Sequence, residues 1–366
     1  MILWSVTLAV FFIFMIMCVI SAVKKAAALF CESKRRLYFV TALLSTVIAL
    51  PVFRVLSLWM ITAFHFMVFY LSAKPFSRLL KSVKSVKSHK AFKYIDSLSI
   101  IPILCTAAVT LYGYFNIHNL VETDYTLITQ KELSKDYCAV LLSDIHYGTT
   151  VHKEYINKLV RKVNQKNPDV ILLCGDIVDE RTSYAQMKEI FSLLSNMKSK
   201  YGIYFVYGNH DRSVYTSSPS FTDAQLKSAI ESNNISILKD QSLCINGEMI
   251  LIGRDDKSVK RKTVSEIMKN TDRNKFILMM DHQPDEFYEK NNEGVDLQVS
   301  GHTHAGQIFP TGLLIDTFHT SDLNYGCKVM SKLTAIVSSG VSGWGIPIRT
   351  EGHSEYVVIN IKYKTR

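Results

Sequence analysis

Five short apolar runs in the second part of this chain each end in a loop that carries histidine, aspartate or asparagine. This regularity restricts the fold more than any other feature. Short apolar runs that alternate with helical stretches are typical of an α/β fold, which binds ligands outside the carboxyl ends of its strands. The five expected strands cover residues 139–143, 170–174, 203–207, 276–280 and 297–300. Helices are expected over 153–167 and 185–197, with further strands over 235–238, 241–245, 249–253, 334–338 and 356–361.

The loops after these strands carry the side chains of metal ligands. Each loop alone has a structural explanation, because aspartate caps helices, Gly-Asn forms turns and histidine occurs in ordinary loops. Five such loops after five strands are hard to explain in that way. The set contains nitrogen and oxygen ligands without thiolate, which suits Mn, Fe, Zn, Co or Ni, and it exceeds what one ion needs, so we expect two divalent metal ions. The candidate residues are Asp144, His146, Asp176, Asn209, His210, Asp211, His282, His302 and His304.

The same residues carry a resemblance to a known family. Five motifs are similar, in order and spacing, to those of the calcineurin-like metallophosphoesterases: Asp144-x-His146, Gly175-Asp176, Gly208-Asn209-His210-Asp211, His282 and Gly301-His302-x-His304. The stretch Val299–Pro310, which contains Gly-His-Thr-His-Ala-Gly-Gln, resembles in particular the YkuE/YaeI-like branch, and transmembrane metallophosphoesterases share it. The resemblance covers nearly all of 137–366 and implies a four-layer α/β/β/α sandwich.

The resemblance also implies a role for each candidate residue. It assigns the first metal ion to Asp144, His146 and His304. It assigns the second to Asn209, His282 and His302, with Asp176 bridging the two ions. A metal-bridging hydroxide is then expected to attack the phosphorus of a phosphoester. His210 is expected to contact the phosphate and to protonate the leaving oxygen, and Asp211 is expected to orient His210, as a carboxylate partner fixes an imidazole.

Long apolar runs make up most of the first part of the chain. Met1 to Val23 contains no charged side chain, and about 20 helical residues cross a bilayer core. Because Lys24 and Lys25 follow this run instead of preceding it, we interpret it as a retained anchor and not as a cleaved signal peptide. An all-α region of about four membrane spans is therefore expected, over 1–23, 37–53, 55–73 and 94–115.

The basic residues of the first part predict an orientation. Residues 1–136 carry 15 Lys and Arg against 6 Asp and Glu, whereas residues 137–366 carry 27 against 26. Most of the surplus lies in the loops 24–36 and 74–93, which share one side of the membrane if all four runs cross it. Such loops face the cytoplasm. We therefore expect a multi-pass protein of the cell membrane whose second domain is extracytoplasmic, and the loss of one span would reverse this.

These expectations combine into a transmembrane region over 1–116, a linker over 117–136 and a metallophosphoesterase domain over 137–366. The expected activity is hydrolysis of a phosphoester, in the first place a phosphodiester. Because the linker is short, membrane lipids, lipid-linked intermediates and wall components are the expected substrates. The near-zero net charge of 137–366 argues against nucleic acid, and no protein partner is inferable. Two alternatives are open: a non-catalytic membrane sensor or scaffold, and a cytoplasm-facing nucleotide phosphoesterase.

Overall fold

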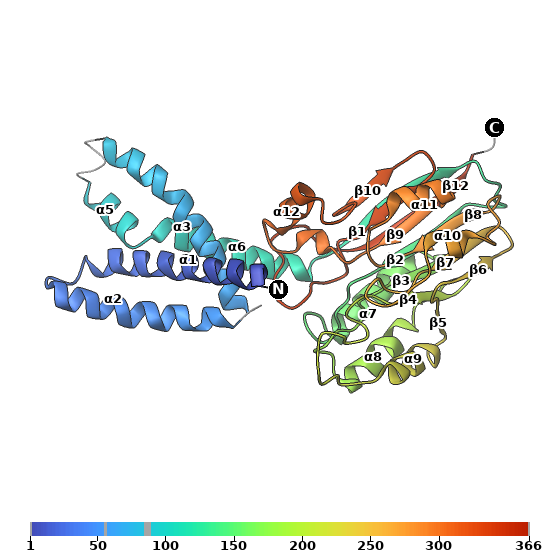
Figure 1. Ribbon diagram of the computed structural model, residues 1–366, viewed down its shortest axis with the longest axis horizontal. Coiled ribbons are helices and arrows are strands. Elements are labelled where there is room, and N and C mark those ends of the chain that lie inside the picture. Colours follow the sequence, from blue (N-terminus) through green and yellow to red (C-terminus); the bar gives the residue numbers. More distant parts are fainter. Residues whose placement is uncertain (1, 55–56, 84–88, 365–366) are drawn as a thin grey trace. The chain divides into compact units, whose positions relative to one another are not determined.

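The computed structural model describes residues 2–54, 57–83 and 89–364, and it divides into two compact units, Met1–Gly113 and Tyr114–Arg366. Each unit is described by itself. The first unit is helical (Figure 1). Its elements are α1 (Ile2–Ala27), α2 (Lys34–Ala49), the 3-10 turn η1 (Leu50–Phe53), α3 (Leu58–Ser82), α5 (Lys90–Ser97) and the first part of α6 (Ile100–His118).

Three helical stretches in the described residues are long and apolar enough to cross a membrane: Ala9–Ala27, Lys34–Phe53 and Ile100–His118. They overlap the expected spans 1–23, 37–53 and 94–115. The expected span 55–73 falls on α3, apart from residues 55 and 56, which lie outside the described residues. Helix α3 is not among the three apolar stretches, and it carries Lys74, Arg78 and Lys81 in its last turns. A fourth span therefore stays a prediction.

The basic stretch 74–93 was expected as a loop, but most of it is helical. Residues 74–82 continue α3 and residues 90–93 begin α5, while 84–88 lie outside the described residues. Asp96 of α5 forms ion pairs with Lys25 at the end of α1 (2.8 Å) and with Lys81 at the end of α3 (2.7 Å). At the opposite end of α3, Trp59 donates to the carbonyl of Ile48 in α2 (2.8 Å). Helices α2 and α3 therefore form a hairpin that returns to the end of α1.

The second unit contains two six-stranded sheets. The first sheet has the strand order β1 (Leu120–Thr129), β12 (Ser354–Tyr363), β2 (Tyr137–Leu142), β3 (Val170–Cys174), β4 (Ile203–Val206) and β5 (Ile235–Ile237). The second has the order β10 (Gly326–Val329), β11 (Thr334–Val337), β9 (Leu297–Ser300), β8 (Phe276–Met280), β7 (Met249–Gly253) and β6 (Gln241–Ile245). Strands β2 to β5 run parallel, as do β7, β8, β9 and β11.

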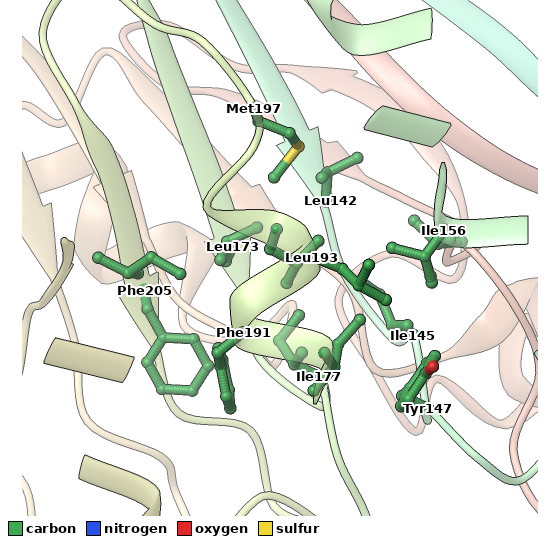
Figure 2. Packing of buried hydrophobic residues seen from close by; sticks show 14 of the residues in the cluster. Leu142, Ile145, Tyr147, Ile156, Leu173, Ile177, Phe191, Leu193, Met197 and Phe205 are labelled. Atoms are coloured by element: carbon green, nitrogen blue, oxygen red, sulfur yellow. The ribbon is translucent and has the colours of Figure 1, made fainter. Parts of the chain in front are cut away.

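Side-chain alternation along these strands builds the four layers. In β2, Ala139 and Leu141 belong to the core between the sheets, which also contains residues of β7, β8 and β9. Val140 and Leu142 belong to the core beneath the helices, where Phe191 packs edge-on against Phe205 of β4 at 6.0 Å (Figure 2). The helices that pack against the first sheet are α7 (Lys153–Gln165), α8 (Tyr184–Leu194) and α9 (Asp223–Glu231). The helices that pack against the second sheet are α10 (Val264–Met268) and α11 (Phe287–Glu293). The expected α/β/β/α sandwich is confirmed.

The stretch 117–136 is not a linker. Strand β1 pairs in parallel with β12 along ten residues, from Leu120 opposite Ser354 to Thr129 opposite Tyr363. The sequence does not predict this strand as an apolar run, because β1 lies at a sheet edge and its apolar residues alternate with polar ones such as Glu122 and Asp124. The α/β unit therefore begins before residue 137, and only Asn119 separates the end of α6 from β1.

Candidate metal centre

The loops that follow β2, β3, β8 and β9 bring two groups of potential ligands together. The ligand atoms of Asp144, His146 and His304 lie within 4.8 Å of one another, and so do those of Asp176, His282 and His302. These are the two groups that the sequence motifs predict. Asn209, in the loop after β4, joins the second group through its Oδ1, which lies 2.9 Å from Nδ1 of His302. The seven predicted ligands therefore converge at the carboxyl ends of the strands.

Short contacts connect the side chains within each group. The Nε2 atom of His282 lies 3.0 Å from Oδ2 of Asp176, and Nε2 of His304 lies 3.4 Å from Oδ1 of Asp144. The His146 and His304 rings stack with their centroids 5.2 Å apart. Of the six side chains in the two groups, all except that of His302 are buried. This arrangement places two carboxylates within a cluster of imidazoles away from bulk water.

The backbone at the ligands is strained. Positive φ angles occur at five of the seven predicted ligands, a conformation that costs about 1–3 kcal/mol for a residue with a side chain. These are Asp144 (53°), His146 (46°), Asp176 (54°), His302 (75°) and His304 (53°). Such strain persists only where the surrounding structure enforces it, and it gathers at functional sites. The strain aims the side chains into the cluster at a cost to stability.

Two glycines permit the close approach of the loops. A Cβ atom on Gly208 would collide with the carboxylate of Asp176, and one on Gly301 would collide with that of Asp144. Neither glycine has a positive φ angle, so the requirement is for space and not for backbone freedom. The motifs Gly-Asn-His-Asp and Gly-His-x-His therefore need their glycines because backbone passes directly over a carboxylate.

The residues present fit divalent metal ions. Among the buried side chains of the described residues, Nε2 of His146 and Nδ1 of His304 have no hydrogen-bond partner, a costly arrangement unless a ligand fills it. The ring of His282 is fixed by a 2.8 Å hydrogen bond between Nδ1 and the carbonyl of Cys174, which leaves Nε2 toward Asp176. A backbone carbonyl that holds one imidazole nitrogen is the usual support of a metal-binding histidine.

The electrostatics of the cluster favour cations. Burial opposes ionisation of Asp144 and Asp176, but the neighbouring histidines hold the pKa of both carboxyls below the usual range. Burial lowers the pKa of His304 to about 3, so its imidazole is neutral at ordinary pH, as a metal ligand requires. Burial also opposes the charged form of His282, yet Asp176 raises its pKa well above the usual value. The raised pKa favours a proton on His282 next to Asp176, and a divalent cation held by the two side chains would replace this proton.

His210 faces the cluster, but a different residue orients it than the one expected. Its ring centroid lies 5.5 Å from that of His146, and its backbone N–H donates to Oδ1 of Asp176 (2.8 Å). Its Nδ1 lies 2.9 Å from Oε2 and 3.0 Å from Oε1 of Glu180, not against Asp211. Burial lowers the pKa of His210, and the Glu180 contact together with Asp176 raises it by more, with a net rise. Glu180 is therefore the positioning residue that the sequence analysis missed.

Asp211 instead fixes the loop that carries Asp176. Its two carboxylate oxygens accept four backbone N–H groups, those of Asp176 (2.8 Å), Ile177 (2.9 Å), Val178 (3.2 Å) and Gly208 (2.7 Å). Burial and the Asp176 charge raise the pKa of Asp211 to about 7, against the effect of these donors. The expected role of Asp211 in orienting His210 is wrong, because its carboxylate is fully used by backbone groups.

Buried polar side chains hold the loops next to the candidate ligands, and the main ones are Arg349 and Gln307. Arg349 is fully buried and donates to the carbonyls of His304 (2.7 Å), Ser339 (2.9 Å) and Ser342. Gln307 accepts from the backbone N–H of Trp344 (2.9 Å) and donates to its carbonyl (3.1 Å). Arg349 therefore supports the loop and does not reach outward as a free phosphate ligand.

Two aromatic rings flank His210. The centroid of the Trp344 ring lies 5.0 Å from that of His210, and the centroid of the exposed Tyr215 ring lies 5.1 Å from it. Trp344 is half-buried and follows directly after Gly343 in the loop that Gln307 holds. The motifs that predict the metal ligands include neither Trp344 nor Tyr215, which only the folded chain brings beside His210.

We predict that the purified full chain binds about two divalent ions, and that Asp176→Asn retains fewer than one because it removes the shared carboxylate. His282→Ala and His304→Ala are each expected to retain about one ion, because each removes a ligand of a single group. Elemental analysis after dialysis against Mn²⁺ and then buffer measures the content. His152→Ala, which changes an exposed histidine outside both groups, is the matched control, and equal loss in that variant would contradict the assignment.

The comparisons with known proteins agree with this geometry. The family model "Calcineurin-like phosphoesterase" matches residues 139–306. An uncharacterised metallophosphoesterase of Helicobacter pylori is 33% identical over 247 residues, which are 66% of this chain and 64% of that protein. One from Campylobacter jejuni is 30% identical over 260 residues, 69% of this chain and 67% of that protein.

A third relative, named a transmembrane protein with metallophosphoesterase domain, comes from Danio rerio. It is 28% identical over 281 residues, 72% of this chain and 62% of that protein. The matched region spans less than two thirds of the Helicobacter pylori and Danio rerio proteins. With two predicted ligand groups assembled at the strand ends of an α/β/β/α sandwich and with these relatives, the chain belongs to the calcineurin-like metallophosphoesterase family.

Proposed function

We propose that this protein is a membrane-anchored phosphoester hydrolase with two metal ions, and that a phosphodiester is its preferred substrate. The observation that carries the proposal is the pair of ligand groups, Asp144 with His146 and His304, and Asp176 with His282 and His302. Two divalent ions at adjacent sites clamp a phosphoryl group and lower the pKa of water, which is the chemistry they would supply here. The set of nitrogen and oxygen ligands fits Mn, Fe, Zn, Co or Ni.

His210 is the proposed general acid of the reaction. The Glu180 carboxylate holds Nδ1 of His210, which leaves Nε2 free to deliver a proton to the leaving oxygen. The raised pKa of His210 favours the protonated form that this role needs. Because the backbone N–H of His210 donates to Asp176, the position of the acid is tied to the bridging ligand. Tyr215 and Trp344, whose rings both lie beside His210, would border the leaving group.

The two other functions considered above are less well supported. A sensor that only binds a ligand has no need of an oriented acid, yet His210 lies against both Glu180 and the ligand cluster. A nucleotide phosphoesterase in the cytoplasm requires an odd number of spans if the amino terminus lies outside. Helices α2 and α3 form a hairpin within the first unit, and Asp96 pairs with Lys25 and Lys81 at its open end. This favours two crossings by the hairpin and four in total.

We therefore propose that the catalytic unit lies outside the cytoplasm and that its substrates are phosphoesters of the membrane or the envelope. Membrane association is supported by three apolar helical stretches and by relatives that are named transmembrane proteins. The connection from α6 to β1 is a single residue, Asn119. So short a connection keeps the catalytic unit close to the bilayer that α6 would cross. No nucleic acid and no protein partner enter the proposal.

The first test is hydrolysis of a generic aryl phosphodiester and an aryl phosphomonoester by the detergent-solubilised full chain. Mn²⁺ should support turnover, a chelator should abolish it, and Asp176→Ala should remove it. His210→Ala should lower kcat by about 10²–10⁴-fold, the usual range for a general acid, with metal content unchanged. Metal-loaded wild-type protein that hydrolyses neither ester would overturn the proposal in favour of the sensor.

The Glu180 contact predicts a change in the pH profile. A general acid must be protonated, so activity falls as pH rises through the pKa of His210. Glu180→Gln removes a carboxylate that raises this pKa, and the alkaline limb of kcat should therefore move to lower pH. Glu231→Gln, which changes an exposed carboxylate of α9, should leave the limb in place. A profile of Glu180→Gln identical to that of wild type would show that Glu180 does not act through His210.

Two native cysteines allow the orientation to be tested. Cys244 and Cys327 are exposed in the second unit. If this unit is extracytoplasmic, a membrane-impermeant thiol reagent should label both in intact cells, and Cys244→Ser/Cys327→Ser should remove that label. Labelling of these two cysteines only after the cells are permeabilised would place the unit in the cytoplasm and favour the nucleotide alternative.

A further inference from the structure

Helix α12 (Thr311–Phe318) presents an apolar face to solvent within the second unit. Leu313 is 56% exposed, Leu314 47% and Phe318 69%, and the preceding Phe309 is 47% exposed. Residues 313, 314, 317 and 318 share one side of an α-helix. Thr317, the polar member of this set, donates its hydroxyl to the carbonyl of Leu313 (2.7 Å) and so exposes no free donor. Contiguous exposed apolar side chains mark an interaction surface.

The opposite side of α12 borders the metal centre. Ile315 of α12 lines a cavity of about 180 Å³ together with Asp285, His302, Thr303, Thr320 and Ser321. His302 belongs to the second ligand group, so the cavity opens beside that group. At the start of the helix, the backbone N–H of Gly312 donates to Glu351 (2.8 Å). One eight-residue helix therefore has an apolar outer side and an inner side that shapes the candidate site.

The same region is joined to the end of α6. Asn116, in the last turn of α6 and within the second unit, donates to the carbonyls of Arg349 (3.1 Å) and Gly352 (2.8 Å). Arg349 in turn holds the carbonyl of His304, and Glu351 holds Gly312. The segment 349–352 is therefore bound by the end of an apolar helix that is long enough to cross a membrane and by the start of α12.

We propose that the outer face of α12, together with Phe309, rests in the interfacial layer of the bilayer, and that its inner side presents the His302 cavity to a phosphoester held in that bilayer. A short helix with an apolar face lies in the plane of a membrane interface with that face turned to the acyl chains. The apolar residues of the outer face are uncharged, the exposed Asp316 lies at the edge of this face, and the nearby end of α6 supplies the membrane. The second half of the proposal rests on the proposed phosphoesterase function, whereas the first half does not.

The docking half is tested by fluorescence on the full chain in phosphatidylcholine vesicles. Leu314→Cys, made in Cys244→Ser/Cys327→Ser protein, carries an environment-sensitive fluorophore, and some lipids carry a spin label on the acyl chain. Quenching by the labelled lipid should be at least about twofold stronger than for the matched control Tyr288→Cys, which lies exposed on α11. Iodide in the water should quench the control more strongly. The cysteine-substituted parent without an added cysteine corrects for background labelling.

Two outcomes would overturn the docking half. A Leu314→Cys label quenched by iodide as strongly as the control would mean that the face is in water. A label reached by neither quencher would mean that protein covers the face, either the chain's own helical unit or a second copy. Because neither readout requires turnover, this test succeeds or fails independently of the phosphoesterase activity.

The substrate half is tested by kinetics with two substrates. Leu313→Ser/Leu314→Ser/Phe318→Ser should lower hydrolysis of a vesicle-embedded phosphodiester by about tenfold and leave hydrolysis of a soluble aryl phosphodiester unchanged. The control Tyr288→Ser/Val329→Ser changes two other exposed apolar residues and should affect neither rate. An equal loss on both substrates would overturn this half, since it would show damage to the cavity, and so would an unchanged rate on vesicles.

Discussion

The carboxylate of Asp211 is the interaction on which the rest of the site depends. It accepts four backbone N–H groups and joins the loop after β3 to the loop after β4. An ionised carboxylate offers about four acceptor sites, whereas an amide or hydroxyl oxygen offers about two. By fixing the Asp176 loop, Asp211 sets the position of the candidate ligand Asp176, whose carboxylate accepts the backbone N–H of His210. The candidate ligands are therefore arranged around a residue that belongs to neither group.

Much of the fold and of the site could be predicted from the sequence because both depend on short local patterns of apolar residues and of ligand motifs. The apolar runs predicted β3, β7 and β8 at their observed bounds, and the ligand motifs follow directly after strands. Glu180 could not be found in this way. It stands beside Asp179, whose carboxylate lies 3.3 Å from His146, and nothing in the spacing tells which of two adjacent carboxylates faces which histidine. Likewise β1 depends on its partner β12, whose paired residues lie 234 positions later in the chain, and α12 depends on tertiary context.

The helical part shows the same limit in another form. Hydropathy identified the apolar stretches of α1, α2 and α6, whereas α3 combines an apolar first half with a basic end. Its direction follows from the contacts of Trp59, Lys81 and Asp96, which composition does not contain. The course of α3 within the helical unit thus rests on a few polar contacts between helices and not on the apolar residues themselves.

Arg349 has a consequence for how this site can vary. It donates to the backbone carbonyls of His304, Ser339 and Ser342 and so joins the loop of His304 to the loop after β11. Every residue type offers a carbonyl, so the identities at positions 339 and 342 can change without loss of this support. The hold of Arg349 on the His304 loop is therefore separate from the buried hydroxyls of Ser339 and Ser342, which hydrogen-bond to the carbonyl of His353 and to the hydroxyl of Thr150.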